Sequence, residues 1–172
     1  MFFNGRPLVR HHPWTGLLAG LTLSSPAFPA GGPIPTQFTC DGANVSPPLT
    51  WSGVPHGARS LALLCDDPDA RSRVWVHWVI YRIPPGATGL PEHLAGSAQL
   101  PDGARQGRND FGQLGYGGPC PPSGTHHYRF TLFALDTELT LAPGATKEQL
   151  LAEMNGHIIG EVTRVGTYHR VR

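Results

Sequence analysis

Two loops of the sequence carry more ionisable side chains than a simple chain reversal needs. In the first loop, the carboxylates of Asp66, Asp67 and Asp69 follow an apolar run, and Trp75 and His77 come shortly after them. A carboxylate held there can accept a hydrogen bond from one nitrogen of His77, which fixes the tautomer and leaves the other nitrogen for a ligand. The competing interpretation is that Asp67 and Asp69 only cap a turn, because aspartate and proline are common turn residues.

The second loop, residues 116–128, combines glycines with prolines and then leads into a histidine and a tyrosine. The glycines let the backbone approach a ligand closely, and the prolines make the loop stiff and poor in hydrogen-bond donors. His126 and Tyr128 are two residues apart, so they share a face once a strand has begun. An imidazole, a phenol and free backbone N–H groups can all donate to an anion. The alternative is an ordinary structural loop.

The apolar pattern predicts the strands that must hold these loops. Residues 60–65 form a continuous apolar run, which is typical of a strand buried on both faces. Residues 74–83 and 128–135 predict two long strands, and both faces of the second are largely apolar. Alternation along 74–83 predicts one face with Val74, Val76, Trp78 and Ile80, and the opposite face with Trp75, His77, Val79 and Tyr81.

Further short apolar runs lie at residues 21–23, 38–40, 49–51 and 162–168, and one segment predicts a helix. That helix begins at a capping box formed by Thr146 and Gln149 and ends at Asn155-Gly156. Six or more strands with so few helices predict a mainly β fold, an antiparallel β-sandwich with one or two short helices near the C-terminus. We expect a single domain over residues 21–172, preceded by a mobile extension over residues 1–20.

Composition and charge exclude several classes of partner. The formal net charge is +1 and charged residues make up 15% of the chain, so no basic field indicates nucleic acid binding. No stretch reaches the ~20 apolar residues of a membrane span. The run 17–21 is shorter than the apolar region of a secretory signal, so we expect a cytoplasmic protein, with a periplasmic or secreted location as the alternative.

Read together, the two loops resemble the phosphatidylethanolamine-binding protein (PEBP) family, and most closely its short bacterial members, the Raf-kinase-inhibitor-like proteins. The resemblance covers residues 21–170 and is specific because several motifs occur in order. They are Phe38-Thr39-Cys40-Asp41-Gly42, Ser46–Trp51, Asp67-Pro68-Asp69-Ala70 followed by Trp75 and His77, Asn109-Asp110-Phe111-Gly112, Gly118-Pro119, Gly124–Tyr128 and Val165–Tyr168.

The resemblance implies a β-sandwich with a small anion-binding pocket at one end. Its wall would consist of Asp67, Asp69, His77, Gly118, Pro119, His126 and Tyr128, with Trp75 at the rim. Asp67 would then orient His77 rather than contact the anion. Arg71 stands where the family commonly has proline, which would place a cation near the mouth. The family motifs also imply that Cys40 and Cys120 lie close enough to pair, while Cys65 in its buried strand stays a free thiol.

Three functions are compatible with this pattern. The first is a non-catalytic protein that binds a small anion or a phosphate-bearing head group, with a regulatory role of the kinase- or protease-inhibitor type. The second is a metal-dependent or other hydrolase that uses Asp67, His77, His126 and His127, although no zinc motif and no nucleophile motif is present. The third is a partner-binding sandwich with a vestigial pocket. We expect no cofactor and no metal; the protein partner, and whether the chain forms a homodimer, stay open.

Overall fold

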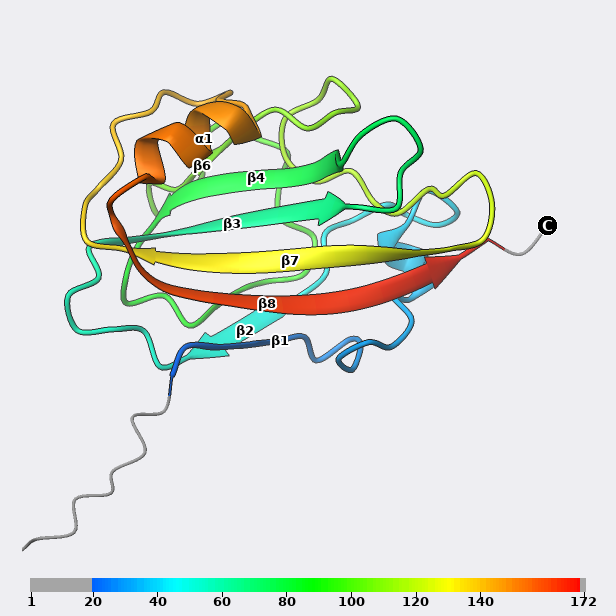
Figure 1. Cartoon of the computed structure of the whole chain (residues 1–172), viewed down its shortest axis with the longest axis horizontal. Coiled ribbons are helices and arrows are strands. Elements are labelled where there is room, and N and C mark those ends of the chain that lie inside the picture. The colour runs from blue at the N-terminus through cyan, green and yellow to red at the C-terminus, as the bar shows by residue number, and fades with distance from the viewer. Residues whose placement is uncertain (1–19, 171–172) are drawn as a thin grey trace, which may run out of the picture.

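The structure is a computed structural model that describes residues 20–170, so residues 1–19 of the expected extension lie outside the described part. Two antiparallel sheets form a sandwich (Figure 1). The smaller sheet has the order β1 (Thr22–Ser24), β2 (Leu49–Ser52), β5 (Gly89–Leu90). The larger sheet has the order β6 (Arg105–Gln106), β4 (Trp75–Ile83), β3 (Ser60–Asp67), β7 (Thr125–Leu135), β8 (Ile158–His169). The predicted mainly β sandwich is confirmed.

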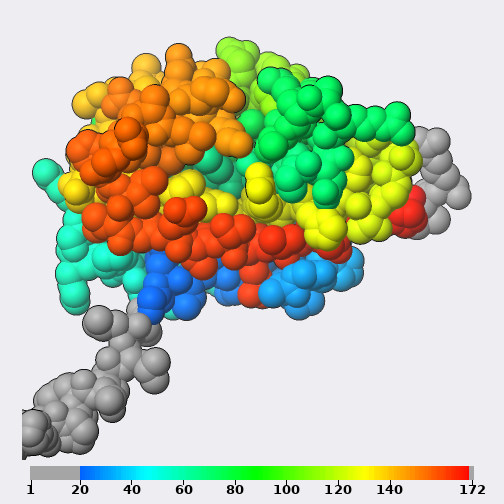
Figure 2. Space-filling view, viewed as in Figure 1, coloured from blue at the N-terminus to red at the C-terminus, as the bar shows by residue number. Residues whose placement is uncertain are grey.

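The core lies in two layers because β3 is buried on both faces, as its continuous apolar run predicts. Leu61 and Leu63 face the smaller sheet, while Ala62 and Leu64 face the helix α1 (Lys147–Met154). The helix buries Leu150 and Met154 against the larger sheet. In Figure 2 its side chains, in orange, cover the outer face of the sheet at the left-hand end.

Most of the predicted elements are confirmed. The helix begins with the expected capping box, in which Thr146 and Gln149 bond each other's backbone N–H groups, and it ends at Asn155 before the left-handed Gly156. Strand β7 is paired on both sides, by β3 and β8. Residues 38–40 are not extended: a short 3-10 helix, η1 (Thr36–Phe38), takes their place, where Thr39 closes the turn by bonding Thr36.

One prediction about β4 is wrong, and the cause is a bulge. Trp78 pairs with Cys65, but the next pair along β3 joins Asp66 to Val76, which leaves His77 as an extra residue. On the N-terminal side of His77, the alternation of β4 is therefore the reverse of the predicted one. Val76 as a result packs beside Val79 on the helix side. His77 moves to the other face of the sheet, where its ring lies edge-on to Tyr128 with centroids 5.2 Å apart.

No helix within residues 20–170 is long and apolar enough to cross a membrane.

Candidate functional site

The two loops singled out in the sequence meet at one end of the sandwich and enclose a pocket. Strand β3 ends there and β7 begins there, so the loop after β3 (green) and the loop before β7 (yellow) lie side by side at the right-hand end of Figure 2. The pocket has a volume of about 250 Å³. Its lining residues are Asp67, Ala70, Arg71, Ser72, Trp75, His77, Phe111, Cys120, Pro121, Pro122 and His126.

Asp67 and His126 form a buried pair at the pocket. Asp67 Oδ2 lies 2.6 Å from His126 Nδ1, and the two side chains are only 5% and 11% exposed. The other carboxylate oxygen of Asp67 accepts the backbone N–H of Asp69, so the group is held at both oxygens. This geometry corrects the expectation that Asp67 orients His77. Asp67 fixes the ring of His126 instead, because Nδ1 of His126 is the nitrogen that its carboxylate reaches.

His77 is oriented by the backbone of the second loop. Its Nδ1 lies 2.6 Å from the carbonyl oxygen of Gly117, and Gly117 N–H donates to the carbonyl of His77 at 2.9 Å. A carbonyl can only accept, so Nδ1 carries the proton and Nε2 has no partner among the described residues. Burial lowers the pKa of His77 below its ordinary value, although the Gly117 carbonyl and the charge of Asp67 oppose that shift. The ring is therefore neutral at pH 7 and presents the lone pair of Nε2.

Tyr128 lies behind the histidines, on the inward face of β7, as predicted from its spacing to His126. Its hydroxyl is buried and has no hydrogen-bond partner among the described residues. Burial, and secondarily the charge of Asp67, raise the pKa of the Tyr128 phenol far above its ordinary value. The hydroxyl therefore stays protonated and is an unused donor next to the ring of His77.

Four of the expected wall residues lie outside the pocket lining: Tyr128, which lies behind the histidines, and Asp69, Gly118 and Pro119. Asp69 points to the neighbouring His127, whose backbone N–H and Nδ1 it accepts at 2.7 and 2.8 Å. The backbone N–H of Gly118 is not free for a ligand, because it donates to Asn44 Oδ1 at 2.8 Å, and the carbonyl of Pro119 accepts from Cys40. These bonds brace the second loop from behind, and a side chain at Gly118 would collide with the Phe38 carbonyl.

The structure adds aromatic and cationic residues to the mouth of the pocket. Trp75 is half-buried at the rim, as expected, and its ring meets Phe111 edge-on at 5.6 Å. Phe111 is 43% exposed and also contacts the ring of His77 at 5.3 Å. Phe111 belongs to the motif Asn109-Asp110-Phe111-Gly112, but its residue type and spacing do not by themselves predict a place in the site. The exposed Arg71 lines the pocket, where a cation was expected.

The carboxylates around the pocket already have partners. Asp66 binds Arg129 and Lys147, and Asp110 accepts from Arg73 and from the backbone N–H of Val76. Asp67 and Asp69 hold their histidines as described above. Arg71 has no ion-pair partner among the described residues, so the pocket lining contains a cation that no carboxylate of those residues neutralises.

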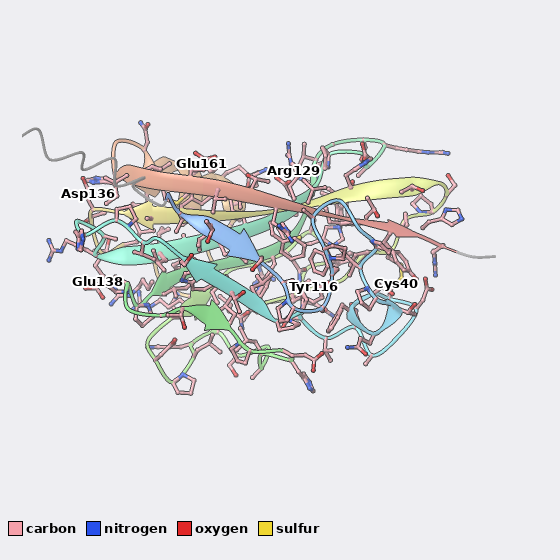
Figure 3. The ribbon with its side chains drawn as sticks, turned by 90° about the horizontal axis from the view of Figure 1, so that it is seen from below. Cys40, Tyr116, Arg129, Asp136, Glu138 and Glu161 are labelled. Carbon is pink, nitrogen blue, oxygen red and sulfur yellow. A yellow bond between two sulfur atoms is a disulfide. The ribbon has the colours of Figure 1, made fainter. Side chains whose placement is uncertain are left out.

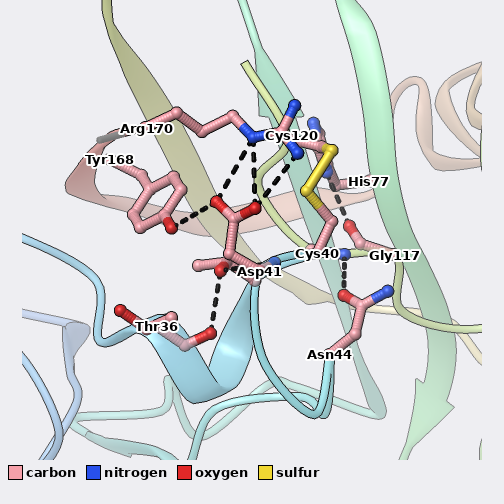
Figure 4. The surroundings of a disulfide bond; sticks show 11 residues. Thr36, Cys40, Asp41, Asn44, His77, Gly117, Cys120, Tyr168 and Arg170 are labelled. Carbon is pink, nitrogen blue, oxygen red and sulfur yellow. Dashed lines mark hydrogen bonds and ion pairs between the residues drawn. A yellow bond between two sulfur atoms is a disulfide. The ribbon is translucent and has the colours of Figure 1, made fainter. Parts of the chain in front are cut away.

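A disulfide joins the second loop to the segment after η1. Cys40 and Cys120 are bonded, with their Cα atoms 5.4 Å apart, which confirms the expectation that they lie close enough to pair; Cys65 is free and buried. Figure 4 shows the bond above Asp41, which accepts hydrogen bonds from Tyr168 and Arg170. In Figure 3, Cys40 and Tyr116 lie at the opposite end of the molecule from Asp136 and Glu138. The disulfide therefore belongs to the pocket end, and Cys120 itself lines the pocket.

The described residues hold no group of three or more histidine, cysteine, aspartate or glutamate side chains placed to bind a metal ion. His77 and His126 each use Nδ1 within the protein, and both oxygens of Asp67 are occupied. The arrangement is therefore two oriented imidazoles beside an arginine and a buried phenol.

Comparison with known proteins decides the family. The family model described as phosphatidylethanolamine-binding protein matches residues 24–169, which span both sheets, the helix and the pocket. The chain belongs to the phosphatidylethanolamine-binding protein family.

Its similarity to members of the PEBP family extends along almost the whole described chain. A UPF0098 protein from Methanothermobacter thermautotrophicus is 58% identical over 150 residues, which cover 87% of this chain and 99% of that protein. Among solved structures, a putative PEBP homologue from Chlamydia trachomatis is 41% identical with a TM-score of 0.82, covering 88% of this chain and 99% of that chain. E. coli YbcL, described as a member of the mammalian PEBP family, is 38% identical with a TM-score of 0.81, covering 89% and 100%.

Proposed function

We propose that this PEBP-family protein binds a small anion, with a phosphate group as the preferred head, in the pocket between His77 and His126. The family name supports a phosphate-bearing head group as the ligand class. In a regulatory role of the inhibitor type, the bound ligand would change the contacts that residues at the mouth of the pocket make with a partner protein.

One observation carries the proposal: both histidines of the pocket have Nδ1 fixed by the protein, and their Nε2 atoms have no partner among residues 20–170. Gly117 holds His77, and Asp67 holds His126. A histidine fixed in this way presents one defined nitrogen to a ligand. Two such nitrogens in a pocket of about 250 Å³ fit one small oxyanion better than an extended polymer.

Donors for the anion come from four side chains with different chemistry. Arg71 supplies a permanent positive charge at the mouth, and guanidinium is well suited to phosphate because it can donate two parallel hydrogen bonds. A protonated His126 would donate Nε2–H while its Nδ1–H stays on Asp67. Ser72 in the pocket lining supplies a hydroxyl donor, and a ligand oxygen that reached past the lining would give the buried Tyr128 hydroxyl the partner that it lacks among the described residues.

His77 decides which protonation state of phosphate fits. Because its Nε2 carries a lone pair at pH 7, it can accept the P–OH hydrogen of a singly protonated phosphate, or it can take up a proton as a more highly charged anion binds. In both routes the complex holds one proton more than free phosphate dianion and free protein with a neutral His77 hold together. We therefore expect phosphate to bind more tightly as the pH falls from 8 towards 6.

The disulfide supports the periplasmic or secreted location over the cytoplasmic one, because disulfides form and persist in oxidising compartments.

The test is a titration of inorganic phosphate, and then of phosphoethanolamine, by calorimetry. We expect dissociation constants between about 1 μM and 1 mM, which corresponds to about −8 to −4 kcal/mol. The variants are His126→Gln and, as a matched control, His127→Gln, which alters the exposed histidine next in sequence, outside the pocket lining. We expect His126→Gln to weaken binding at least tenfold and His127→Gln to bind as the wild type does. Equal affinities for all three proteins would overturn the proposal.

A further inference from the structure

The motif Asn109-Asp110-Phe111-Gly112 is not explained by the anion pocket alone, and its geometry points to a second pocket. Asn109 is 3% exposed, and its Oδ1 accepts the backbone N–H groups of both Phe111 and Gln113, at 3.0 and 3.1 Å. Its Nδ2 donates to the carbonyl of Gly115 at 3.0 Å. One buried amide thus fixes a tight loop in which Phe111 and Gln113 stand on either side of Gly112.

Phe111 and the disulfide form the partition between two neighbouring pockets. Phe111 and Cys120 line the anion pocket, and both also line a second pocket of about 290 Å³ on the other side. Gly117 lies directly under the Phe111 ring, since a Cβ at that position would come within 2.5 Å of the ring. The two pockets are therefore separated by one aromatic ring and one disulfide.

The second pocket differs from the first in its chemistry. Its lining contains no charged side chain; the polar groups are the side-chain amides of Asn44 and Gln113 and the backbone of Gly117 and Gly118. Asn44 Oδ1 accepts from Gly118 N–H, and Figure 4 shows the amide nitrogen of Asn44 turned away from that bond. Neither that nitrogen nor the side-chain amide of Gln113 has a hydrogen-bond partner among the described residues.

We propose that the second pocket is a subsite for a neutral, amide-bearing arm attached to the anion. A primary amide offers a donor and an acceptor side by side, which matches another amide better than it matches a charged group. The ligand class is then a phosphorylated compound whose phosphate lies between His77 and His126 and whose short arm passes over Phe111 to Gln113. This inference rests on the proposed function, because the phosphate site anchors the arm.

Any ligand of this class contains both a phosphate and an amide. The probes therefore keep the phosphate and vary the arm. N-acetyl-O-phosphoserine methylamide carries the phosphate and two amides, ethyl phosphate carries the phosphate and an apolar arm, and inorganic phosphate is the head alone. We expect the amide probe to bind the wild type roughly two- to tenfold more tightly than ethyl phosphate, the gain of one neutral hydrogen bond. Glycerol 3-phosphate tests whether a hydroxyl arm gives the same gain, which would overturn the preference for an amide.

The decisive variant is Gln113→Ala, with Gln99→Ala as the matched control. Gln113 shares its backbone bonds with Asn109, and these do not involve the side chain, so the alanine variant keeps the loop. Gln99 is an exposed glutamine that lines neither pocket. The measured quantity is the ratio of the affinities for the amide probe and for ethyl phosphate.

We expect Gln113→Ala to reduce that ratio to about one and Gln99→Ala to keep the ratio of the wild type. A ratio of one in the wild type, or a ratio that survives Gln113→Ala, overturns the inference while leaving the phosphate site intact. The absence of any phosphate binding by the wild type instead overturns the proposed function, so the two failures are distinguishable. Circular dichroism of each variant checks that the fold is retained.

Discussion

Asp66 and Asp67 are neighbours in sequence, yet their carboxylates serve opposite faces of the larger sheet. Asp67 turns to the pocket and lies 2.6 Å from Nδ1 of His126. Asp66 turns to the helix side and accepts from Arg129 Nε at 2.8 Å and Lys147 Nζ at 2.9 Å. Successive residues of a strand face opposite ways, so one of the two adjacent aspartates at the end of β3 faces the pocket and the other holds the helix.

Asp67→Asn should weaken phosphate binding. The asparagine keeps the volume but removes the charge that balances a protonated His126, and hydrogen bonds to charged groups contribute about 1.5–3 kcal/mol. We expect a loss of affinity of roughly tenfold or more, measured by calorimetry at pH 7. Asp69→Asn is the control, since Asp69 holds the exposed His127. If Asp67→Asn lowers only the melting temperature, then Asp67 has a purely structural role.

Asp66→Asn should lower the stability of the protein and leave phosphate binding unchanged. Burial opposes ionisation of Asp66, but the hydrogen bonds from Arg129 and Lys147 outweigh it and lower the pKa of the carboxyl. A lowered pKa means that the carboxylate stabilises the fold above the unfolded value of ~3.9 and that this contribution is lost as the pH falls through the folded value. We expect Asp66→Asn to unfold at lower urea concentration at pH 7 and to bind phosphate normally. The stability difference from the wild type should shrink at pH 2–3.

The stability of the protein should fall on mild acidification because of His77. Its pKa is lowered by burial, so below the ordinary value of ~6.5 the unfolded chain binds a proton that the folded protein resists. The free energy of unfolding therefore decreases as the pH drops through about 6.5. Urea titrations at pH 8 and pH 5.5 should show a larger decrease for the wild type than for His77→Gln, and saturating phosphate should reduce that difference. Parallel decreases in both proteins would contradict this assignment.

Reducing the Cys40–Cys120 disulfide should destabilise the protein. The bond connects positions 80 residues apart, and removing a native disulfide typically costs about 2–5 kcal/mol. We expect a dithiol reductant to lower the melting temperature of the wild type and of Cys65→Ala. The double variant Cys40→Ser/Cys120→Ser should already melt lower and should not respond to reductant.

Thiol labelling checks the same assignment independently. Without reductant the folded protein should react slowly with a thiol reagent, because Cys65 is buried, and the urea-unfolded protein should expose one thiol per chain. Three reactive thiols in unreduced, unfolded protein would show that the disulfide does not form.

Local pattern alone determined most of the elements. The continuous apolar run of β3 identified a strand buried on both faces, and Thr146 with Gln149 identified the start of α1. The two-residue spacing of His126 and Tyr128 placed both on the inward face of β7. Each of these features depends on residues close together in the chain, where spacing is set by the 2.0 and 3.6 periodicities of strand and helix.

Which histidine Asp67 contacts was decided by tertiary structure. Local alternation grouped His77 with Val79 and Tyr81, but the bulge opposite Cys65 and Asp66 moved it to the other face, and a bulge depends on how β4 pairs with β3. Likewise, Asn44 takes the backbone N–H of Gly118 from 74 residues away. The sequence by itself identified the two loops that meet at the pocket. The strand register and the packed loops decided which of their side chains meet, because hydrogen bonds between distant segments form only where folding brings both partners within about 3 Å.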